Sequence, residues 1–456
     1  MTKLNIKAHR EAWSQAVAGE RPFYLERPAV FSPAAAAQDI SNRSRMLWNW
    51  APVWLPWEYT NWLEEGRSFH DTAYLGDWSA LVKVQIRGPE ALEFLSYIGT
   101  NDLSNFSIGR VTHHVQVNED GKIAAQGVLY RVGDEEFWFT GGSAYWAYYM
   151  LKQGRWDAEA LVDSADHFLF SVQGPQSLSI MEAATGADLG NLRFNQWDAF
   201  ELAGATVRVL RTGITGEIGY ELHGAAEYGN AVWSRVVDVG ERFGLKQLGV
   251  RAQAISHVEA GIATNDRDFV SAAADTPGRP QISPSARSWV IGSFRPDDIS
   301  ELYRTPAELG WHRQVSLETH DFVGRDALVE QRRAGGPSRQ LVGLVWNPQD
   351  VVRVYSTLFD GEPLPQMDLP RHLGLAVDQI VAGGTRLGVS TSRVYSPVLR
   401  QMISLGHNDA PFDPGRELGI LWGEPDGHQI EIRATVTELP FKSDVRRAQP
   451  HTTGGL

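Results

Sequence analysis

The sequence predicts an α+β fold from three features: strand-like alternation, helix-like periodicity, and the irregular order in which the two occur. From Leu81 to Arg87 apolar and polar residues alternate as in a half-buried strand, whereas residues 89–98 repeat apolar positions at helical spacing. Further strands are expected at residues 111–118, 122–131 and 136–140, and further helices at 8–20, 143–153, 175–185 and 226–243. This order lacks the regular strand–helix–strand repeat of a Rossmann domain, which favours α+β over α/β.

Chain length and one break in the pattern predict about three domains. Periodicity stops at residues 334–338, where glycine and charge dominate, and this break separates residues 1–335 from the remainder of the 456-residue chain. Short strands are expected after it at residues 341–346, 384–389, 418–422 and 429–436. They predict a β-rich domain over residues 338–445, followed by a disordered polar tail at 446–456.

Composition excludes several classes of protein. A hydrophobic content of 43% and a charged content of 21% are ordinary for a soluble globular protein, and no apolar run suggests a signal peptide or a membrane span. We therefore expect a cytoplasmic protein without a membrane partner. The net charge of −13 argues against a nucleic-acid partner, because phosphates require a basic face. The absence of cysteine excludes disulfides, thiolate metal sites and a cysteine nucleophile.

No group of residues has the spacing of a metal site. His113 and His114 are neighbours on a predicted strand, so their rings point to opposite faces and cannot share one metal ion. The stretch from His257 to Glu259 is too short for a zincin motif. We therefore expect no metal.

The most informative segment is residues 211–222, which read Arg-Thr-Gly-Ile-Thr-Gly-Glu-Ile-Gly-Tyr-Glu-Leu. Its glycines permit close backbone approach and predict a tight loop that leads into a strand at Gly219. Successive strand side chains alternate in direction, so Tyr220 and Glu221 are expected on opposite faces. A carboxylate there suits a ligand with neighbouring N–H donors, such as the amino-pyrimidinone edge of a pterin. A β-hairpin with an exposed glutamate is the alternative interpretation.

This segment resembles the RTGYTGEDGFE motif of the aminomethyltransferase (glycine-cleavage T-protein) family of tetrahydrofolate enzymes. Further pieces of that family's pattern follow in the same order, at residues 88–91, 100–102, 109–110, 118–121, 173–175, 251 and 258–261. The ordered series spans roughly residues 70–270 and is more specific than any single piece. The resemblance implies the aminomethyltransferase fold in a three-domain arrangement. Residues 1–335 would form two intertwined α+β subdomains, one at roughly 81–165, and residues 338–445 a domain like a β-barrel.

The C-terminal half narrows the resemblance to one branch. Segments 346–347, 354–360 and 421–424, and the block 58–62, are similar to the tetrahydrofolate-dependent O-demethylases of vanillate, syringate and related acids. The implied reaction moves a methyl group from a small methoxylated aromatic acid to N5 of tetrahydrofolate, giving a phenol and 5-methyltetrahydrofolate. Demethylation of a sulfonium or betaine is one alternative. A non-catalytic folate-binding module is another, disfavoured because such modules rely on a reactive cysteine.

The resemblance also assigns residues to the cofactor, tetrahydrofolate. Glu221 is expected to hold the pterin edge, and Glu217 is the second candidate because it lies in the loop rather than on the strand. Arg251 matches the folate-contacting arginine of the family. Gln126 and Tyr220 complete the expected cofactor-binding set.

Departures from the family pattern bear on the chemistry. Ala125 and Gln126 stand where the aminomethyltransferases carry an acidic pair, which implies methyl transfer without methylene chemistry. A histidine and a tyrosine, which in the demethylases are thought to handle the departing phenol oxygen, are replaced within residues 77–80 and by Gln253. Without them, the proton donor must come from elsewhere in the chain.

Protonation of the leaving oxygen is worth about 10²–10⁴-fold in rate. His257 is the first candidate for the donor, since an imidazole titrates near neutrality and the fold is expected to bring this segment beside the folate. Tyr59 and His70 are the reserve candidates. A sulfonium or quaternary ammonium substrate has a neutral leaving group and would need no acid.

Tryptophan is concentrated near the N-terminus, where six of the 16 residues lie between positions 48 and 78. Most of these rings are expected to pack onto the core, and two or three to wall the substrate site, where they suit an aromatic ring or a methylated cation. The candidates for the substrate pocket are Trp50, Trp54, Trp57 and Trp78. The exact methyl donor and the oligomeric state stay open at this point.

Overall fold

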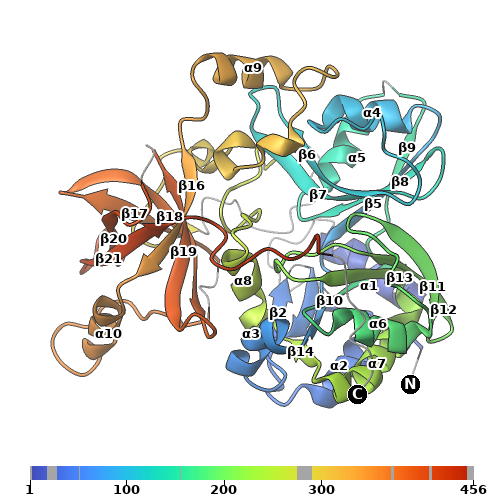
Figure 1. Ribbon diagram of the computed structural model, residues 1–456, viewed down its shortest axis with the longest axis horizontal. Helices are drawn as coiled ribbons and strands as arrows, with labels where there is room; N and C mark the ends of the chain where they lie inside the picture. The colour runs from blue at the N-terminus through green and yellow to red at the C-terminus, as the bar shows by residue number, and fades with distance from the viewer. Residues whose placement is uncertain are drawn as a thin grey trace.

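The computed structural model describes residues 3–17, 28–50, 52–154, 156–274, 290–370, 374–409 and 413–448. Three large sheets in this part of the chain form the centres of three lobes (Figure 1). Most strand pairs are antiparallel, and helices pack beside the sheets rather than in a regular alternation with parallel strands. The architecture is therefore the α+β class that the sequence predicts.

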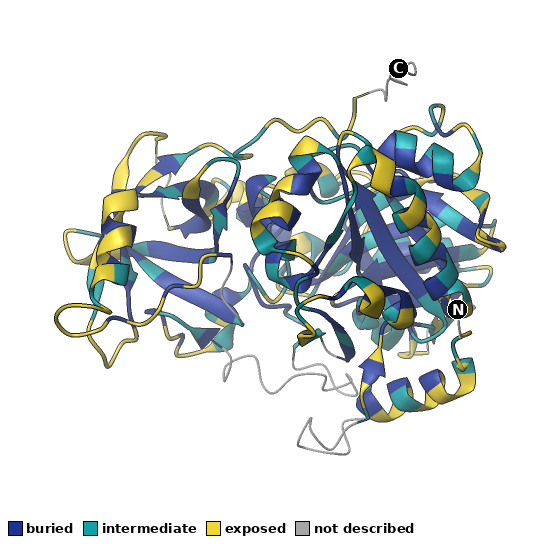
Figure 2. Cartoon of the chain, turned by 90° about the horizontal axis from the view of Figure 1, so that it is seen from below, coloured by how far each residue is buried: buried dark blue, intermediate teal, exposed yellow. Residues whose placement is uncertain are grey.

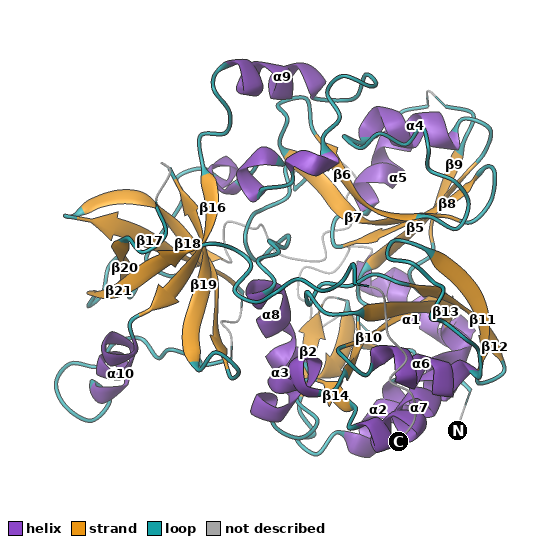
Figure 3. Cartoon of the chain, in the orientation of Figure 1, coloured by secondary structure: helices purple, strands orange, loops and turns teal. Residues whose placement is uncertain are grey.

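The first lobe is built on a six-stranded sheet in the order β11-β12-β13-β10-β4-β14. Its strands are β4 (Tyr74–Asp77), β10 (His167–Gln173), β11 (Trp197–Leu202), β12 (Ala205–Leu210), β13 (Gly219–Ala225) and β14 (Lys246–Leu248). Its helices are α2 (Ala35–Ser41), α3 (Trp62–Asp71), α6 (Ser177–Thr185), α7 (Gly229–Gly240) and α8 (Val250–Glu259). Helices α2, α6 and α7 contribute to the hydrophobic core on one face of the sheet (Figure 3).

An N-terminal layer packs against this lobe. It consists of α1 (Ile6–Val17) and the small sheet of β1 (Val30–Phe31), β2 (Leu47–Trp50) and β3 (Val53–Pro56). Trp13, Val53 and Leu55 form its own small hydrophobic cluster together with Val250, the first residue of α8.

The second lobe is inserted between β4 and β10 of the first sheet. It holds β5 (Val82–Arg87), α4 (Ala91–Ile98), β6 (Val111–Val117), β7 (Ile123–Arg131), β8 (Glu136–Gly141), α5 (Tyr145–Leu151) and β9 (Glu159–Val162). The strands form a sheet in the order β6-β7-β8-β5-β9, and α4 and α5 cover one of its faces. The chain leaves the first sheet after β4, forms the second lobe, and returns to the first sheet at β10. The sequence of the second lobe therefore interrupts that of the first.

The third lobe is a seven-stranded sheet that curls until β17 also pairs with β20. Its strands are β15 (Val290–Ile291), β16 (Gln340–Trp346), β17 (Leu375–Ala382), β18 (Thr385–Ser396), β19 (Gln401–Asn408), β20 (Glu417–Trp422) and β21 (Ile430–Thr437). Helix α10 (Pro348–Ser356) packs against its strands β19 and β21, whereas α9 (Arg325–Arg333), which precedes β16, packs against the β6–β7 turn of the second lobe. Strand β15 precedes the predicted boundary at residue 335, yet it pairs with β17. Figure 2 shows the strands of the lobes buried and the outer helix faces exposed.

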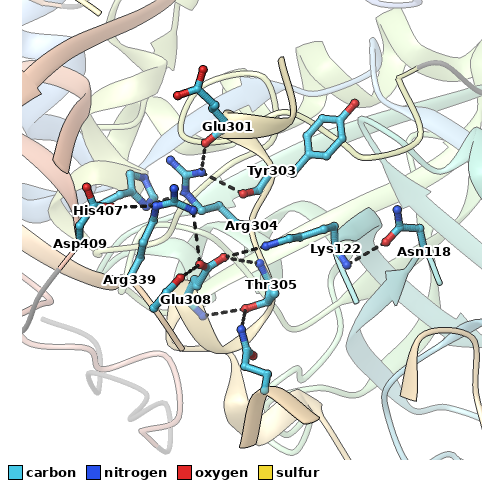
Figure 4. Close-up of polar contacts among 12 residues, drawn as sticks. Asn118, Lys122, Glu301, Tyr303, Arg304, Thr305, Glu308, Arg339, His407 and Asp409 are labelled. Carbon is cyan, nitrogen blue, oxygen red and sulfur yellow. Dashed lines mark hydrogen bonds and ion pairs between the residues drawn. The ribbon is translucent and has the colours of Figure 1, made fainter. Parts of the chain in front are cut away.

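A buried polar cluster, which we name the lobe junction, ties the second lobe to the third (Figure 4). Its members are Lys122, Arg304, Thr305, Glu308, Arg339 and His407. The Glu308 carboxylate, only 1% exposed, lies 3.7 Å from Lys122 Nζ and 3.6 Å from Arg339 Nη1, and it accepts a 2.7 Å hydrogen bond from the Thr305 N–H. Arg304 donates to two main-chain carbonyls, and burial lowers its pKa to about 10.

None of the helices in the described residues combines the length and the apolar character that a bilayer span requires.

Candidate functional site

The first sheet turns one face toward its core and the other toward the middle of the molecule. Tyr220 and Leu222 lie in the core together with α6 and α7. Residues that oppose one another on neighbouring antiparallel strands share a face. Gly76, Ser171 and Glu221 oppose one another on β4, β10 and β13, so they lie together on the other face, which we name the site face. Its members are Tyr74, Gly76, Ser171, Gln173, Glu221 and His223. Glu221 and Tyr220 thus point to opposite sides, as period-two alternation predicts.

Two glycines of the 211–222 segment, Gly213 and Gly219, are required by the side chain of Gln173. A Cβ atom on Gly213 would lie 2.1 Å from Gln173 Oε1, and one on Gly219 would lie 2.6 Å from its Cδ. Gln173 in turn accepts a 2.9 Å hydrogen bond from the Thr215 hydroxyl and donates 3.3 Å to the Thr212 carbonyl. The amide therefore fills the inside of the loop and fixes its shape.

Glu221 extends from β13 with a partly accessible carboxylate. Its side chain is 16% exposed, and its one hydrogen bond among the described residues joins Oε2 to His223 Nε2 at 3.3 Å. The phenol of Tyr130, on β7 of the second lobe, lies 3.4 Å from His223 Nδ1. Burial raises the pKa of Tyr74 and of Tyr130, and the nearby charge of Glu221 adds to both shifts. Glu221 therefore lies among aromatic hydroxyls from two lobes.

Glu217 is held by the end of the chain. Residues 441–448, which we name the C-terminal strap, run from the third lobe to the 211–217 loop (Figure 1). Lys442 pairs with the Glu217 carboxylate and donates 3.2 Å to the Thr215 carbonyl, and the Val445 N–H donates 2.8 Å to the Gly216 carbonyl. Because Lys442 neutralises it, Glu217 has less acceptor capacity for a ligand than Glu221.

The far end of the strap is also fixed. The Arg446 guanidinium donates 3.2 Å to the Gly213 carbonyl, and buried Arg211 donates to the carbonyl of Ala448. The predicted tail begins at residue 446, so Arg446 and Ala448, which make these contacts, belong to it. Residues 449–456 lie outside the described part of the chain.

Gln126 lies on the face of the second sheet that is turned toward β13. It shares that face of β7 with Tyr130, four residues on, which reaches His223. Its Oε1 lies 2.8 Å from His113 Nε2, and the His113 ring meets Trp311 edge-on at 4.8 Å. Burial lowers the pKa of His113. His114 lies on the other face against Phe139, as the strand alternation predicts.

Trp78 covers the site face two strands away from Glu221, a lateral distance of roughly 10 Å. Its ring stacks on Tyr74 at 5.9 Å and lies so close above Gly76 that a Cβ there would be 2.1 Å from the ring. The other predicted tryptophans belong to the N-terminal layer. Trp50 and Trp57 pack on its hydrophobic cluster, with Trp57 5.6 Å from Trp48, and Trp54 is half-buried on β3.

Helix α8 positions Arg251 and His257. Arg251 lies in the first turn, 2.7 Å from Glu58 Oε2 and above the Trp62 ring. His257 is buried, with Nε2 3.3 Å from the Thr264 hydroxyl and 3.8 Å from Asp268 Oδ2. Burial raises the pKa of Asp268.

The two reserve candidates have different surroundings. His70 lies at the end of α3, where its Nε2 is 2.5 Å from the buried carboxylate of Glu259, beside the start of the strap. Tyr59 is buried in the core of the first lobe and stacks on Trp233 at 6.3 Å. Burial raises the pKa of Tyr59 well above its usual range, so this phenol has little tendency to release a proton. Neither Tyr59 nor Tyr220 lies on the site face.

The family can now be identified. The family described as the GCVT N-terminal domain matches residues 22–276, more than half of the chain. The chain belongs to the aminomethyltransferase superfamily. The sesamin methylene transferase of a Sinomonas species is 33% identical over 414 residues, which cover 85% of this chain and 90% of that protein. The syringate O-demethylase of a Sphingobium species is 30% identical over 429 residues, covering 86% of this chain and 91% of that protein.

The fold agrees with this membership. The crystal structure of the glycine cleavage system aminomethyltransferase T from Bartonella henselae superposes with a TM-score of 0.70 at 21% identity, covering 91% of this chain and 98% of that one. The aminomethyltransferase fold with its C-terminal barrel domain, which the sequence predicts, is thereby confirmed.

Members of this superfamily are transferases that use tetrahydrofolate. This protein is likewise a tetrahydrofolate-dependent transferase. The donor set of the site face fits that cofactor. Glu221 offers a carboxylate with spare acceptor capacity beside aromatic side chains, which matches the N–H donors and flat ring of a pterin. Sequence reasoning named Glu221 as a candidate but did not name His223, which the same alternation places on its face two residues further on. Gln173 belongs to the matching piece 173–175 but was given no role, and no local signal pointed to Tyr130 or Lys442.

Proposed function

We propose that this protein is a tetrahydrofolate-dependent O-demethylase that moves a methyl group from a small methoxylated aromatic acid to N5 of tetrahydrofolate. The products are a phenol and 5-methyltetrahydrofolate. The observation that carries the proposal is the replacement of the family's acidic pair by Ala125 and Gln126. Of the two residues that replace the family's acidic pair, Ala125 is buried among the helices of the second lobe and Gln126 is an amide bound to His113. No carboxylate is therefore offered at those two positions to assist closure of a methylene bridge.

Glu221 is the proposed acceptor for the pterin N–H groups, and tetrahydrofolate supplies the nucleophile, N5. Arg251 supports the site from the start of α8, where Glu58 fixes its guanidinium. Gln126 contributes its amide from the second sheet, and Glu217 acts through the loop rather than on the ring, because Lys442 occupies it. Trp78 is the proposed aromatic wall for the donor, since it lies on the site face beside Tyr74.

We assign the proton for the departing oxygen to His257. Its Nε2 lies 3.8 Å from Asp268 Oδ2, and its position on α8 places the ring six residues after Arg251. His70 is the second candidate, paired with Glu259. His113 is less suited, because burial lowers its pKa and keeps its ring neutral.

The role of His257 is tested with two donors that differ in their leaving group. His257→Ala is expected to lower kcat about 10²–10⁴-fold for a methoxybenzoate. A nitro-substituted methoxybenzoate leaves as a weakly basic phenolate, so its kcat should fall much less in the same variant. Equal losses for both donors would remove His257 from proton transfer.

The relative named a methylene transferase supports a second candidate function, transfer of a methylene group from an aromatic donor to tetrahydrofolate. The aromatic wall suits such a donor equally well. Replacement of the acidic pair by Ala125 and Gln126 is the observation against it. A sulfonium or betaine donor remains the third candidate, for which no acid would be required.

One experiment separates these reactions. The purified protein is incubated with tetrahydrofolate and, in parallel, with syringate, vanillate, 3,4-methylenedioxybenzoate, glycine betaine or dimethylsulfoniopropionate. The folate products are separated by liquid chromatography and identified by mass. We expect 5-methyltetrahydrofolate and the corresponding phenol from a methoxybenzoate. Formation of methylenetetrahydrofolate from the methylenedioxy compound, or turnover of a cationic donor alone, would overturn the demethylase proposal.

A further inference from the structure

Three polar groups from two lobes form a line that ends at the Glu221 carboxylate. Tyr130 Oη, on β7, lies 3.4 Å from His223 Nδ1, and His223 Nε2 lies 3.3 Å from Glu221 Oε2. His223 is buried, and its ring meets Tyr130 at 5.2 Å and 72°. The line crosses from the second sheet to the first, so the relative placement of the two lobes sets its geometry.

The chemistry of these groups fixes the direction of the hydrogen bonds. An ionised carboxylate only accepts, so the proton between His223 and Glu221 must be on Nε2. Neutral imidazole then has Nδ1 as an acceptor, and the Tyr130 hydroxyl donates to it. Burial lowers the pKa of His223, partly offset by Glu221, and the charges of Lys83 and Arg208 lower it further, which keeps the ring neutral at pH 7. Among the described residues, the second oxygen of Glu221 accepts no hydrogen bond.

We propose that His223 is a positioning residue: held by Tyr130, it donates the hydrogen bond that orients Glu221 toward the folate ring. The inference rests on the proposed role of Glu221 as the pterin acceptor. A glutamate side chain has several rotamers, and a donor that selects one of them before binding reduces the ordering cost of the complex. His223 binds one carboxylate oxygen and leaves the other for the ligand.

The simpler alternative is that His223 only fills space between the lobes. Two variants separate these roles. His223→Gln keeps an N–H donor near the position of Nε2, whereas His223→Leu keeps bulk and removes the donor. Affinity is measured by isothermal titration calorimetry with 5-formyltetrahydrofolate, a stable ligand with an intact amino-pyrimidinone edge. We expect about tenfold weaker binding for His223→Leu and at most about threefold for His223→Gln.

Two further variants complete the test. Tyr130→Phe removes only the hydroxyl, folds as a conservative change, and should weaken binding about threefold by freeing the His223 ring. Glu221→Gln measures the acceptor itself. If Glu221→Gln binds as tightly as the parent, both the pterin assignment and this inference are overturned. If Glu221→Gln weakens binding but His223→Leu and Tyr130→Phe do not, or if His223→Leu and His223→Gln lose equally, only the inference is overturned.

Discussion

Glu308 at the lobe junction and Glu221 on the site face are both largely shielded glutamates, yet their surroundings differ in kind. Glu308 lies near two cations and accepts hydrogen bonds from the Thr305 N–H and, at 3.1 Å, from the Ser338 hydroxyl. Within the described ranges, the Glu221 carboxylate has one hydrogen bond, 3.3 Å long, from a neutral histidine. A carboxylate whose acceptor positions are filled by the protein serves the fold. One that keeps an unfilled position next to aromatic rings is available to a ligand.

A substitution at the lobe junction should therefore lower the stability of the protein. Glu308→Gln removes the charge that balances the partly exposed Lys122 and Arg339 and leaves buried Arg304 without a nearby anion at this position. We expect a loss of about 3–5 kcal/mol in the free energy of unfolding, measured by chemical denaturation. The control is Glu330→Gln, whose ion pair with Arg333 is largely exposed and should change stability by less than about 0.5 kcal/mol. Equal effects of the two variants would contradict the difference between these environments.

A substitution of Glu221 on the site face should instead lower the affinity for folate. Glu221→Ala removes the charged acceptor for the pterin N–H groups, with an expected cost of about 1.5–3 kcal/mol in the binding of 5-formyltetrahydrofolate. Its effect on the free energy of unfolding should be small, because few protein groups depend on this carboxylate. Calorimetric titration and denaturation of the same variant measure the two quantities. A Glu221→Ala protein that is strongly destabilised but binds as tightly as the parent would assign Glu221 to the fold.

Acid should weaken the junction through His407. Burial, together with the charges of Arg304 and Arg339, lowers the pKa of His407 well below its usual value. The folded state therefore resists protonation more than the unfolded state. The stabilising effect is complete above about pH 6.5 and is lost as the pH falls toward the folded-state pKa.

The expected loss is about 1.4 kcal/mol in unfolding free energy for each pH unit below 6.5. His407→Gln removes this titration, so its stability should fall less than that of the parent between pH 6.5 and 5.5. Other buried histidines remain in both proteins, and the difference between the two profiles isolates His407. Parallel profiles would show that His407 is not the acid-sensitive group.

Much of the fold could be predicted because burial of one face imposes a local period. The strand expected at 136–140 is β8 at Glu136–Gly141, and the helix expected at 226–243 is α7 with single helical turns at both ends. Alternation also placed Tyr220 and Glu221 on opposite faces, but it did not say which face is the core: Tyr220, expected to bind the cofactor, is buried in the core of the first lobe. The residues around 36–66 show no clear period, because this segment combines the short α2, which packs on the core of the first lobe, with the short strands β2 and β3 of the N-terminal layer.

Alternation can place residues of the candidate site together only where they are close in the sequence. His223 follows Glu221 by two residues, whereas Lys442 is 225 residues from its partner Glu217 and Tyr130 is 93 residues from His223. Composition also could not distinguish a tryptophan that lines the candidate site from one that packs in a hydrophobic cluster. Trp78 lies on the site face, whereas Trp57 packs in the N-terminal layer. Such distinctions depend on tertiary contacts.

The smallest effect is expected at the ion pair between Lys442 of the C-terminal strap and Glu217 of the 211–217 loop. Both side chains are largely buried, and Lys442 also donates to the Thr215 carbonyl, so the pair fixes the loop that leads into β13. Lys442→Ala should weaken folate binding by about 0.5–1 kcal/mol, because a looser loop must be ordered when the ligand binds. Lys442→Arg, which keeps the cation, is the matched control.

The double variant with Glu217→Ala measures the coupling between the two side chains. If the strap acts through this pair, the second change should add little to the first. Fully additive losses would show that Lys442 and Glu217 act on the ligand independently, and that Glu217, like Glu221, is a binding carboxylate.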